Sequence, residues 1–381
     1  MKFSCEKALL MNAISQASKT VAVKSSIPAL EGLLLEALAN DLVRVTGYDL
    51  KTGIRALVPA DIRETGSLVL SARLFGEIIR KMPDDTVYIT TDGFTVNLRC
   101  GLSEFNIQAI DASEYPDLPA VEYLNTFEMK QEDLRDMIER TGFAISQNDA
   151  RPVHTGALFE VEPTEEGKHK LTMVAVDGYR LALRREEVIR VHGAKTFKFV
   201  VPGSALKEVK TIVGAIDDYV EVIQGERHIM FKTGDVILVT RRLEGEFLNY
   251  KQAIPSNSSI RVTTDTRRLI QSIERCSLII NETQKSPLRC TFTDGCIQIK
   301  TSTVLGNAYD ECPVIGNGNQ LEIGFNNRYM LDALKAVPAA TVDLSLNTAV
   351  SPCIITRAEG VDAPLDSFTY MVLPVRLRAG N

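Results

Sequence analysis

Apolar residues follow the same helical spacing in three segments of the chain, over residues 72–81, 204–215 and 326–337. The segments can be aligned so that apolar residues coincide at intervals of three and four, which places them on one face of a helix. Each segment is followed by a turn and then by an alternating stretch, TVYIT, YVEVI or TVDLSL, which is typical of a strand. The pattern therefore predicts a helix, a turn and a strand that are used three times.

A second helical pattern also occurs three times, over residues 6–20, 131–144 and 265–280. Each copy follows a short alternating stretch, KFSC, TFEM or IRVTT. The two patterns alternate in a fixed order with a period of about 125–135 residues, which is far longer than a solenoid repeat. This order predicts an α+β protein that consists of three tandem domains of one fold.

Two segments that carry proline and asparagine separate the repeats, Asp111–Thr126 and Glu246–Ser259. Segments of this composition are typical of linkers between compact domains. We therefore predict an N-terminal domain over residues 1–120, a central domain over residues 127–253 and a C-terminal domain over residues 254–381.

The composition excludes several classes of protein and of site. No apolar run is long enough to span a bilayer, and the opening residues, MKFSCEKALL, lack the hydrophobic region of a signal peptide. The seven cysteines contain no C-x-x-C pair, which is typical of reduced thiols in a cytosol. The four histidines show no ligand spacing. We expect a cytoplasmic protein without a membrane segment, a metal site or a cofactor.

Catalytic motifs are also missing, since the chain holds no glycine-rich dinucleotide loop, Walker loop or G-x-S-x-G motif. The segment VDGYRLALRR at Val176–Arg185 gathers Asp, Tyr and Arg. It is nevertheless typical of an Asp-Gly turn that opens a strand, with Leu181 and Leu183 facing a core. TGYDLKTGIRA at Thr46–Ala56 is the equivalent segment of the first repeat. Because one segment is used in two domains, we interpret it as architecture and expect no catalytic residue and no enzyme activity.

The charge of the chain is unevenly distributed. Its net charge is −6, yet the predicted helices together carry more Lys and Arg than Asp and Glu. Helices that are more basic than the remainder favour an anion on the side of the protein that bears them.

Several segments match a known family: MKFSCEKALL at the start, TGYDL, VDGYRLAL, IGFNNRYMLDAL and TYMVLPVRL near the end. By their order and spacing the chain resembles the bacterial sliding clamp, the beta subunit of DNA polymerase III, over essentially its full length. The resemblance implies a ring-shaped, head-to-tail homodimer in which each chain supplies three tandem copies of the DNA-clamp fold. Helices would line the ring interior, and antiparallel sheets would form the outside.

The same resemblance implies a DNA polymerase processivity factor. The ring would encircle double-stranded DNA without reading its sequence and would tether the replicative DNA polymerase through a peptide-binding pocket. The clamp loader and other proteins with clamp-binding motifs would dock in that pocket too. Weak attraction to phosphate suits such a ring, because it holds the DNA and still permits sliding.

The family's interface and DNA-facing residues carry over by position. The resemblance places the dimer interface near Leu102, Glu104 and Phe105 of one chain and near Leu278 and Ile279 of the other. The DNA-facing candidates are one asparagine and the basic residues of the lining helices and their flanks: Lys24, Arg73, Arg80, Asn148, Lys207, Lys210, Arg268 and Lys335. Pro152 and Val153 stand where the family carries an aromatic pair that touches DNA, which puts that contact in doubt.

The partner-peptide pocket carries over in the same way, because partners in this family present a short peptide with a leucine and an aromatic residue. The implied pocket residues are Arg151, His154, Val176, Gly178, Tyr179, Arg180, Leu181, Leu248, Asn326, Tyr329, Val350, Met371, Val372, Leu373, Pro374, Val375 and Arg376. Leu248 replaces a proline of the family, His154 replaces a leucine, and Gln284 stands where some members carry a phenylalanine. We expect these departures to shift the peptide preference.

Two other functions stay open from the sequence. An enzyme that uses the clamp fold would require an activity of the purified protein, and the missing catalytic motifs argue against it. A peptide-binding adaptor that never encircles DNA would fail to remain on circular DNA after loading.

Overall fold

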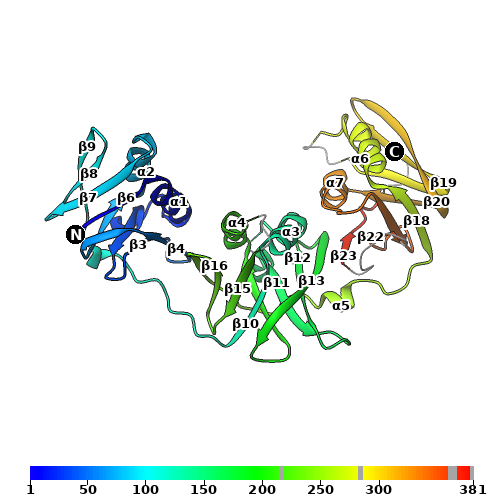
Figure 1. Cartoon of the computed structure of the whole chain (residues 1–381). Coiled ribbons are helices and arrows are strands. Elements are labelled where there is room, and N and C mark those ends of the chain that lie inside the picture. Colours follow the sequence, from blue (N-terminus) through cyan, green and yellow to red (C-terminus); the bar gives the residue numbers. More distant parts are fainter. Residues whose placement is uncertain (149, 215–217, 282–285, 359–366, 378–381) are drawn as a thin grey trace. The chain divides into compact units, whose positions relative to one another are not determined.

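The computed structural model describes residues 1–148, 150–214, 218–281, 286–358 and 367–377 (Figure 1). Contacts within the chain divide it into two compact units. Unit 1 comprises Met1–Arg135, Ile189–Ala194 and Ser204–Arg242, and unit 2 comprises Asp136–Val188, Lys195–Gly203 and Leu243–Asn381. The division falls inside the predicted central domain, so the domain limits drawn from the sequence stay a prediction.

The helices and strands occur in the order that the repeat predicts. The α-helices of the described residues are α1 (Lys7–Ala17), α2 (Ala72–Lys81), α3 (Gln131–Thr141), α4 (Gly203–Ile212), α5 (Tyr250–Ala253), α6 (Thr266–Ser277) and α7 (Asn327–Lys335). The strands up to the middle of the chain are β1 (Lys2–Glu6), β2 (Gly32–Ala37), β3 (Leu42–Tyr48), β4 (Thr52–Pro59), β5 (Asp61–Glu64), β6 (Gly66–Ser71), β7 (Thr86–Asp92), β8 (Thr95–Cys100), β9 (Ser103–Gln108), β10 (Asn125–Lys130), β11 (Gly156–Pro163) and β12 (His169–Val176). The remaining strands are β13 (Arg180–His192), β14 (Phe197–Pro202), β15 (Tyr219–Gln224), β16 (His228–Thr233), β17 (Val236–Arg241), β18 (Ile260–Asp265), β19 (Leu288–Thr303), β20 (Gly306–Phe325), β21 (Thr341–Leu346), β22 (Cys353–Arg357) and β23 (Phe368–Val372).

The structure confirms the predicted helices and the strands that flank them. Two of the predicted helices end in 3-10 turns, at Ser18–Thr20 and Gly142–Ala144, so their α-helical parts are shorter than the apolar pattern suggests. The prediction of a plain linker over Glu246–Ser259 misses α5. This short helix forms because the Asn249 side chain accepts a hydrogen bond from the backbone N–H of Gln252 and thereby caps its first turn.

The second helix illustrates how the apolar spacing becomes a packed face. Phe75 and Ile79 of α2 are buried in the core of unit 1, whereas Arg73 and Arg80 on the opposite face are exposed. The Ser71 side chain begins the helix by accepting a hydrogen bond from the backbone N–H of Leu74. The helix therefore buries its apolar side against the sheets and presents basic side chains on the other.

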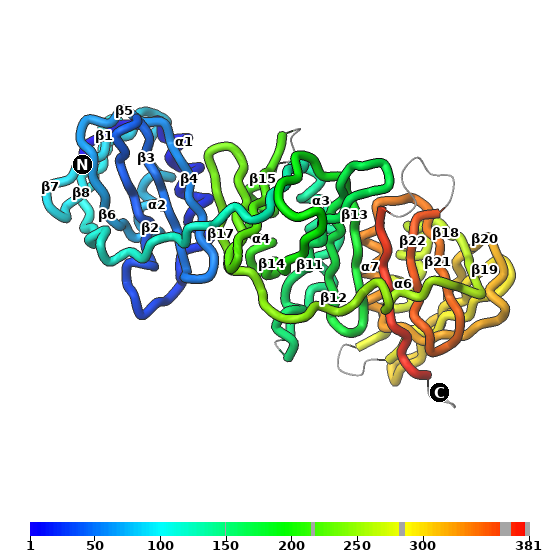
Figure 2. The backbone as a smooth tube through the Cα atoms, turned by 90° about the horizontal axis from the view of Figure 1, so that it is seen from below, coloured from blue at the N-terminus to red at the C-terminus, as the bar shows by residue number. Residues whose placement is uncertain are grey.

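Unit 1 contains two antiparallel sheets. One has the strand order β5-β1-β7-β8-β9, and the other continues through β6-β2-β3-β4-β17-β16-β15-β10. The pairing of β4 with β17 joins a strand of the predicted N-terminal domain to a strand of the predicted central domain, and Figure 2 shows the two strands side by side. At the end of this pairing, the hydroxyls of Thr52 and Thr240 lie 3.1 Å apart and are buried.

Unit 2 repeats this arrangement with different strands. One antiparallel series runs β14-β11-β12-β13-β23-β22-β21-β18, and the long β19–β20 hairpin meets β18 at Thr263 and Ile315. The pairing of β13 with β23 extends from Arg180 opposite Val372 to Arg184 opposite Phe368. A strand of the predicted central domain is therefore hydrogen-bonded to a strand near the end of the chain.

The segment VDGYRLAL forms the turn and strand that its sequence predicts. The Asp177 carboxylate accepts hydrogen bonds from the backbone N–H groups of Tyr179 and Arg180, and Gly178 has a φ of +88°. The equivalent turn in unit 1 is built alike, since the Asp49 carboxylate accepts hydrogen bonds from the backbone N–H groups of Lys51 and Thr52, and Leu50 adopts a φ of +70°. A positive φ strains a leucine but not a glycine, so the turn itself is the repeated feature.

The cysteines are all free thiols, and all of them except Cys296 are buried. Burial raises the pKa of Cys5 and of Cys353 to about 12. Burial also raises the pKa of Cys276 and Cys312. Within the described residues, no helix is long and apolar enough to cross a membrane.

Candidate functional site

Unit 2 contains a cavity of about 550 Å³ that opens beside the turn between β12 and β13. Segments from distant parts of the sequence line it: the loop after α3, the turn at 176–180, the segment that contains α5, and the end of β23. The lining residues are Ser146, Asn148, Ala150, Arg151, His154, Val176, Asp177, Gly178, Arg180, Leu248, Ala253, Pro352, Met371 and Leu373.

The floor of this cavity belongs to the apolar core of unit 2. Val176 and Met371 are buried members of the core cluster, and Leu248 and Leu373 pack against it while remaining partly exposed. Because these side chains come from separate segments, the cavity exists only when β23 is paired with β13. An apolar floor with a few polar groups at its edge is the usual construction of a ligand site.

Arg180 is the most constrained polar group in the cavity wall. Its guanidinium pairs with Asp177 at 2.9 Å and with Asp332 of α7 at 2.5 Å, and only 10% of its side chain is exposed. The same guanidinium lies over the ring of Tyr329, 4.6 Å from its centroid. The ring of Tyr179 stacks on Tyr329 with the centroids 5.7 Å apart. Two carboxylates and a ring therefore fix Arg180 and leave it little freedom to move.

The segment that follows β23 is held by backbone hydrogen bonds on both sides. The N–H of Leu373 donates to the carbonyl of Tyr179 at 2.8 Å, and the N–H of Val375 donates to the carbonyl of Gly324 at 2.8 Å. A Cβ on Gly324 would lie 2.6 Å from both the Val375 carbonyl oxygen and a methyl group of Leu377. A glycine is therefore needed for this segment to lie against β20.

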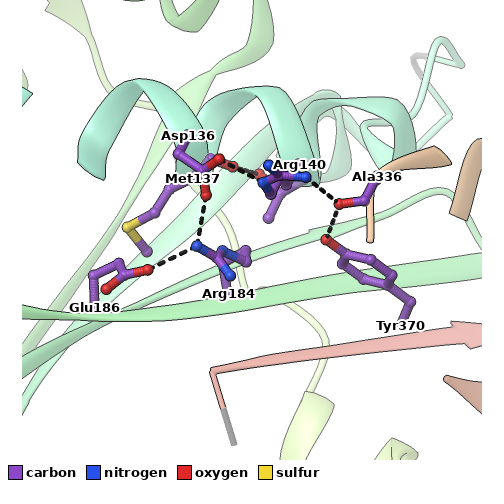
Figure 3. Close-up of polar contacts among 8 residues, drawn as sticks. Asp136, Met137, Arg140, Arg184, Glu186, Ala336 and Tyr370 are labelled. Carbon is purple, nitrogen blue, oxygen red and sulfur yellow. Dashed lines mark hydrogen bonds and ion pairs between the residues drawn. The ribbon is translucent and has the colours of Figure 1, made fainter. Parts of the chain in front are cut away.

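A polar network connects α3, β13, β23 and the end of α7 (Figure 3). Asp136 accepts hydrogen bonds from Arg140 at 2.5 Å and from Arg184 at 2.6 Å. Arg184 also donates to Glu186 at 2.7 Å. The carbonyl of Ala336 accepts from both Arg140, at 2.9 Å, and the hydroxyl of Tyr370, at 3.1 Å. Since Tyr370 precedes Met371, the network fixes the strand that supplies one wall of the cavity.

His154 is a buried titratable group in the wall. Its side chain packs edge-on against Phe247, with the ring centroids 5.4 Å apart. Burial, and to a smaller extent the charge of Arg151, lowers the pKa of His154 below its ordinary value of 6.5. The imidazole is therefore neutral at physiological pH, and it has one hydrogen-bond donor and one acceptor.

Comparisons with known proteins agree with this architecture over the whole chain. The family models of the DNA polymerase III beta subunit match in order: the N-terminal domain at residues 1–119, the central domain at residues 128–249 and the C-terminal domain at residues 251–376. The beta sliding clamp of Bacillus subtilis is 30% identical over 388 residues, which cover 99% of this chain and 100% of that protein.

The chain belongs to the DNA polymerase III beta subunit family. The crystal structure of the Bacillus subtilis sliding clamp matches with a TM-score of 0.92 at 29% identity, covering 99% of this chain and 100% of that one. The DNA polymerase III beta subunit of Pseudomonas aeruginosa matches with a TM-score of 0.91 at 26% identity over the same shares. The predicted fold class, three tandem clamp domains with antiparallel sheets, is thereby confirmed.

As a member of the sliding clamp family, the chain is a processivity factor of DNA replication and not an enzyme. It acts as a homodimer that binds DNA, a DNA polymerase and the clamp loader. The Asp, Tyr and Arg residues around Val176–Arg185 accordingly serve the turn and the cavity wall. Among the described residues, no cluster of three or more His, Cys, Asp or Glu side chains could hold a metal ion.

The structure brings about half of the implied pocket residues together around the cavity. Those that line it are Arg151, His154, Val176, Gly178, Arg180, Leu248, Met371 and Leu373. Tyr179, Asn326, Tyr329, Val350, Val372, Pro374, Val375 and Arg376 do not line it, and neither does Leu181, which is fully buried in the core. Gln284 lies outside the described residues.

Several residues that line the cavity were not predicted from the sequence as pocket residues. Ser146, Ala150, Asp177, Ala253 and Pro352 line the cavity, and so does Asn148, which the sequence assigns to the DNA-facing set. Asp177 could have been found from the motif VDGYRLAL, because the residue that caps its turn also orients Arg180. The other residues have no periodic or compositional signal, since they reach the cavity only through the pairing of distant strands.

The DNA-facing candidates are mostly exposed side chains on helices. Arg73 and Arg80 lie on α2, Lys207 on α4, Arg268 on α6 and Lys335 on α7. Arg73 pairs with Glu77 at 3.5 Å, and Lys335 pairs with Glu274 at 2.7 Å. Lys24 lies in the loop before β2 and is exposed, and Lys210 of α4 is partly buried.

The implied interface residues occupy two exposed places, one in each unit. Leu102 is fully exposed at the turn between β8 and β9, and Phe105 of β9 is 40% exposed. Glu104 accepts a hydrogen bond from the Asn97 amide at 2.6 Å. In unit 2, Leu278 is 83% exposed at the end of α6, and Ile279 is partly buried.

We predict that Asp136→Ala weakens unit 2 because it removes the carboxylate shared by Arg140 and Arg184. Only 7% of the Arg184 side chain is exposed, and its Nε atom is buried without a partner. Glu186 still balances part of the charge, so the expected loss of unfolding free energy is about 2–3 kcal/mol. Urea denaturation measures it. Glu132→Ala on the same helix is the control, because its carboxylate lies 3.9 Å from Lys130 on the surface and is worth less than about 1 kcal/mol. Equal losses in the two variants would contradict the prediction.

Proposed function

We propose that the cavity of unit 2 is the pocket through which this clamp holds its partners on DNA. The observation that supports the proposal is the joint construction of the cavity by the turn at 176–180 and the segment after β23. A cavity of about 550 Å³ lies within the range of small-ligand and peptide-anchor pockets. Its apolar floor suits an aliphatic or aromatic anchor of a short linear segment, and its polar edge suits the backbone of that segment.

The implied pocket residues outside the cavity extend this proposal to a neighbouring surface. Val350 is 72% exposed, and Tyr179 is 60% exposed where it stacks on Tyr329. Asn326 caps α7 by accepting hydrogen bonds from the backbone N–H groups of Arg328 and Tyr329, so it holds that ring in place. A second anchor of the peptide would rest on these rings and beside Pro374, Val375 and Arg376.

We expect a truncation after Val372 to abolish the binding of a fluorescently labelled peptide that carries a leucine and an aromatic residue. The truncation leaves β23 and its pairing with β13 in place, and it removes Leu373 from the cavity wall. A truncation after Leu377, which keeps the bonds to Tyr179 and Gly324, is the matched control and should bind normally. Fluorescence anisotropy gives both affinities, and unchanged affinity in the shorter protein would place the peptide site elsewhere.

We also propose that the dimer forms between the exposed edge of β9 in one chain and the region of Leu278 and Ile279 in the other. β9 is the last strand of its sheet, and β19 pairs only with β20 in the described part of unit 2. Unpaired strand edges with exposed apolar residues invite pairing with another chain. Because the two surfaces differ, the contact is head-to-tail and forms a ring if its rotation closes.

Phe105→Arg is expected to give monomers, since it puts a charge into this apolar contact. Native mass spectrometry should then detect a 42.0 kDa species in place of one of twice that mass. Tyr123→Arg is the matched control, because Tyr123 is an exposed aromatic residue outside the proposed interface. The placement of the interface is wrong if Phe105→Arg remains a dimer of unchanged stability.

Duplex DNA would meet the basic side chains of the helices and the loop residue Lys24, with Asn148 as a polar contact. Support comes from Lys24, Arg80, Lys207 and Arg268, which are exposed and have no ion-pair partner in the described part of the chain. The surface pairs of Arg73 and Lys335 are weak enough to be exchanged for phosphate contacts. Such contacts hold DNA without reading its sequence.

Replacing Arg80 or Lys207 with alanine should weaken DNA binding by similar factors on unrelated sequences. Each change should also reduce the slope of log K against log salt concentration by about 0.9 if one phosphate contact is lost. Lys198→Ala, on β14, is the control and should leave the slope unchanged. Binding that ignores salt or depends strongly on sequence would overturn this assignment.

Two further predictions are part of the proposal. We propose that the chain works in the cytoplasm, which is supported by seven free thiols. We also propose that its domains span residues 1–120, 127–253 and 254–381.

Retention on circular DNA after loading, and release on linearisation, tests the ring against a peptide-binding adaptor. An adaptor would be lost from both templates.

A further inference from the structure

A second cavity of about 410 Å³ lies beside the first in unit 2. It is formed by residues 151–154 and 244–249. Arg151, His154 and Leu248 line both cavities, so these three side chains form their common wall. A peptide in the first cavity would therefore contact this wall on one side.

His154 is a member of this wall whose imidazole, unlike its backbone, makes no hydrogen bond to the described residues. Its side chain is buried, with 7% of the residue exposed, and its backbone N–H and carbonyl bond to Arg151 and Ser146. The described residues offer the imidazole nitrogens no hydrogen bond, although the ring lines both cavities. Neither imidazole nitrogen is among the buried side-chain atoms that lack a partner, so both are accessible from the cavities and can bond to water. A ligand that covers these nitrogens without supplying a partner loses those bonds, which costs free energy, whereas a ligand that supplies a partner replaces them.

We propose that His154 determines specificity in the peptide site by hydrogen-bonding an amide or carboxylate side chain of the docked segment. The inference rests on the proposed peptide-binding function of the first cavity. The neighbouring groups favour an oxygen acceptor, because Arg151 shares the wall and has no ion-pair partner in the described residues. Arg180 is already neutralised by Asp177 and Asp332 and does not compete for the ligand.

The neutral state of the imidazole supports this role. A neutral histidine can donate through one nitrogen and accept through the other, so it matches an amide as well as a carboxylate. A docked peptide with an apolar side chain of the same length would cover the imidazole nitrogens and give them no hydrogen-bond partner. A site that hydrogen-bonds a polar group strongly rejects an analogue without that group. An apolar site rejects a polar analogue less strongly.

A peptide scan tests the proposal. The parent probe is a six-residue peptide that ends in Leu-Phe and carries alanine at the other positions. In the scan, each alanine is replaced in turn by Gln, Glu or Met. These three side chains have nearly the same length, so they differ mainly in polarity. At one position, the Gln or Glu peptide should bind the unaltered protein about tenfold more tightly than the Met peptide. In His154→Leu this difference should disappear. In His169→Leu, which changes a histidine that lines neither cavity, it should persist.

The outcomes separate this inference from the function on which it rests. If the peptides bind but the Gln–Met difference is missing, or is equally large in His154→Leu, then the role of His154 is wrong and the peptide site stands. If no peptide binds the unaltered protein, or if the peptides bind the truncation after Val372 as tightly as the unaltered protein, then the peptide site and the inference both fail.

A measurement on the unaltered protein covers the case in which His154→Leu does not fold. The chain has only four histidines, so nitrogen NMR of their rings is tractable. The ring nitrogen signals of His154 should shift with the preferred Gln or Glu peptide and stay in place with its Met counterpart. Equal shifts with both peptides would refute a hydrogen bond to the polar side chain.

Discussion

A strand at the edge of a sheet needs a partner for its backbone N–H and carbonyl groups, and this requirement organises the whole chain. In unit 1 the edge of β4 is satisfied by β17, and in unit 2 the edge of β13 is satisfied by β23. Each pairing joins strands from different repeats. Neighbouring repeats are therefore connected by backbone hydrogen bonds as well as by the chain, which is why the compact units do not coincide with the repeats.

The cavity is a consequence of the second pairing. Once β23 lies against β13, Met371 reaches the floor beside Val176, and the next residues cross toward Tyr179 and Gly324. The network around Asp136 makes the register of this strand costly to change, because Tyr370 and Arg140 share one carbonyl oxygen. The wall of the cavity is thus held by the polar network around Asp136 as well as by the contacts of Arg180 in its own lining.

Much of the fold could be predicted from the sequence because the information is local. Phe75 and Ile78 are three residues apart in α2, and the helical period places both on the face that is buried. The turn at Asp177 was equally accessible, since Asp-Gly chemistry is local too. The apolar pattern did not predict the short helix α5, because its signal is a single capping residue, Asn249, rather than a periodic apolar face.

The site could be predicted only in part, since it depends on contacts between distant segments. Resemblance to a family located Arg151, Val176 and Met371, but no local pattern indicates that Pro352 and Ala253 reach the same cavity. Asn148, which the resemblance places in the DNA-facing set, also lines the cavity, and no local pattern indicates this second position.

The burial of the thiols has a practical consequence for labelling this protein. A maleimide or a disulfide reagent attacks the thiolate, and burial leaves Cys5 and Cys353 protonated and out of reach. A new cysteine at the fully exposed Leu102 would therefore react ahead of most native thiols, with only Cys296 needing replacement. A single dye or crosslinker could then be attached at the proposed subunit boundary while the buried cysteines of the core are kept.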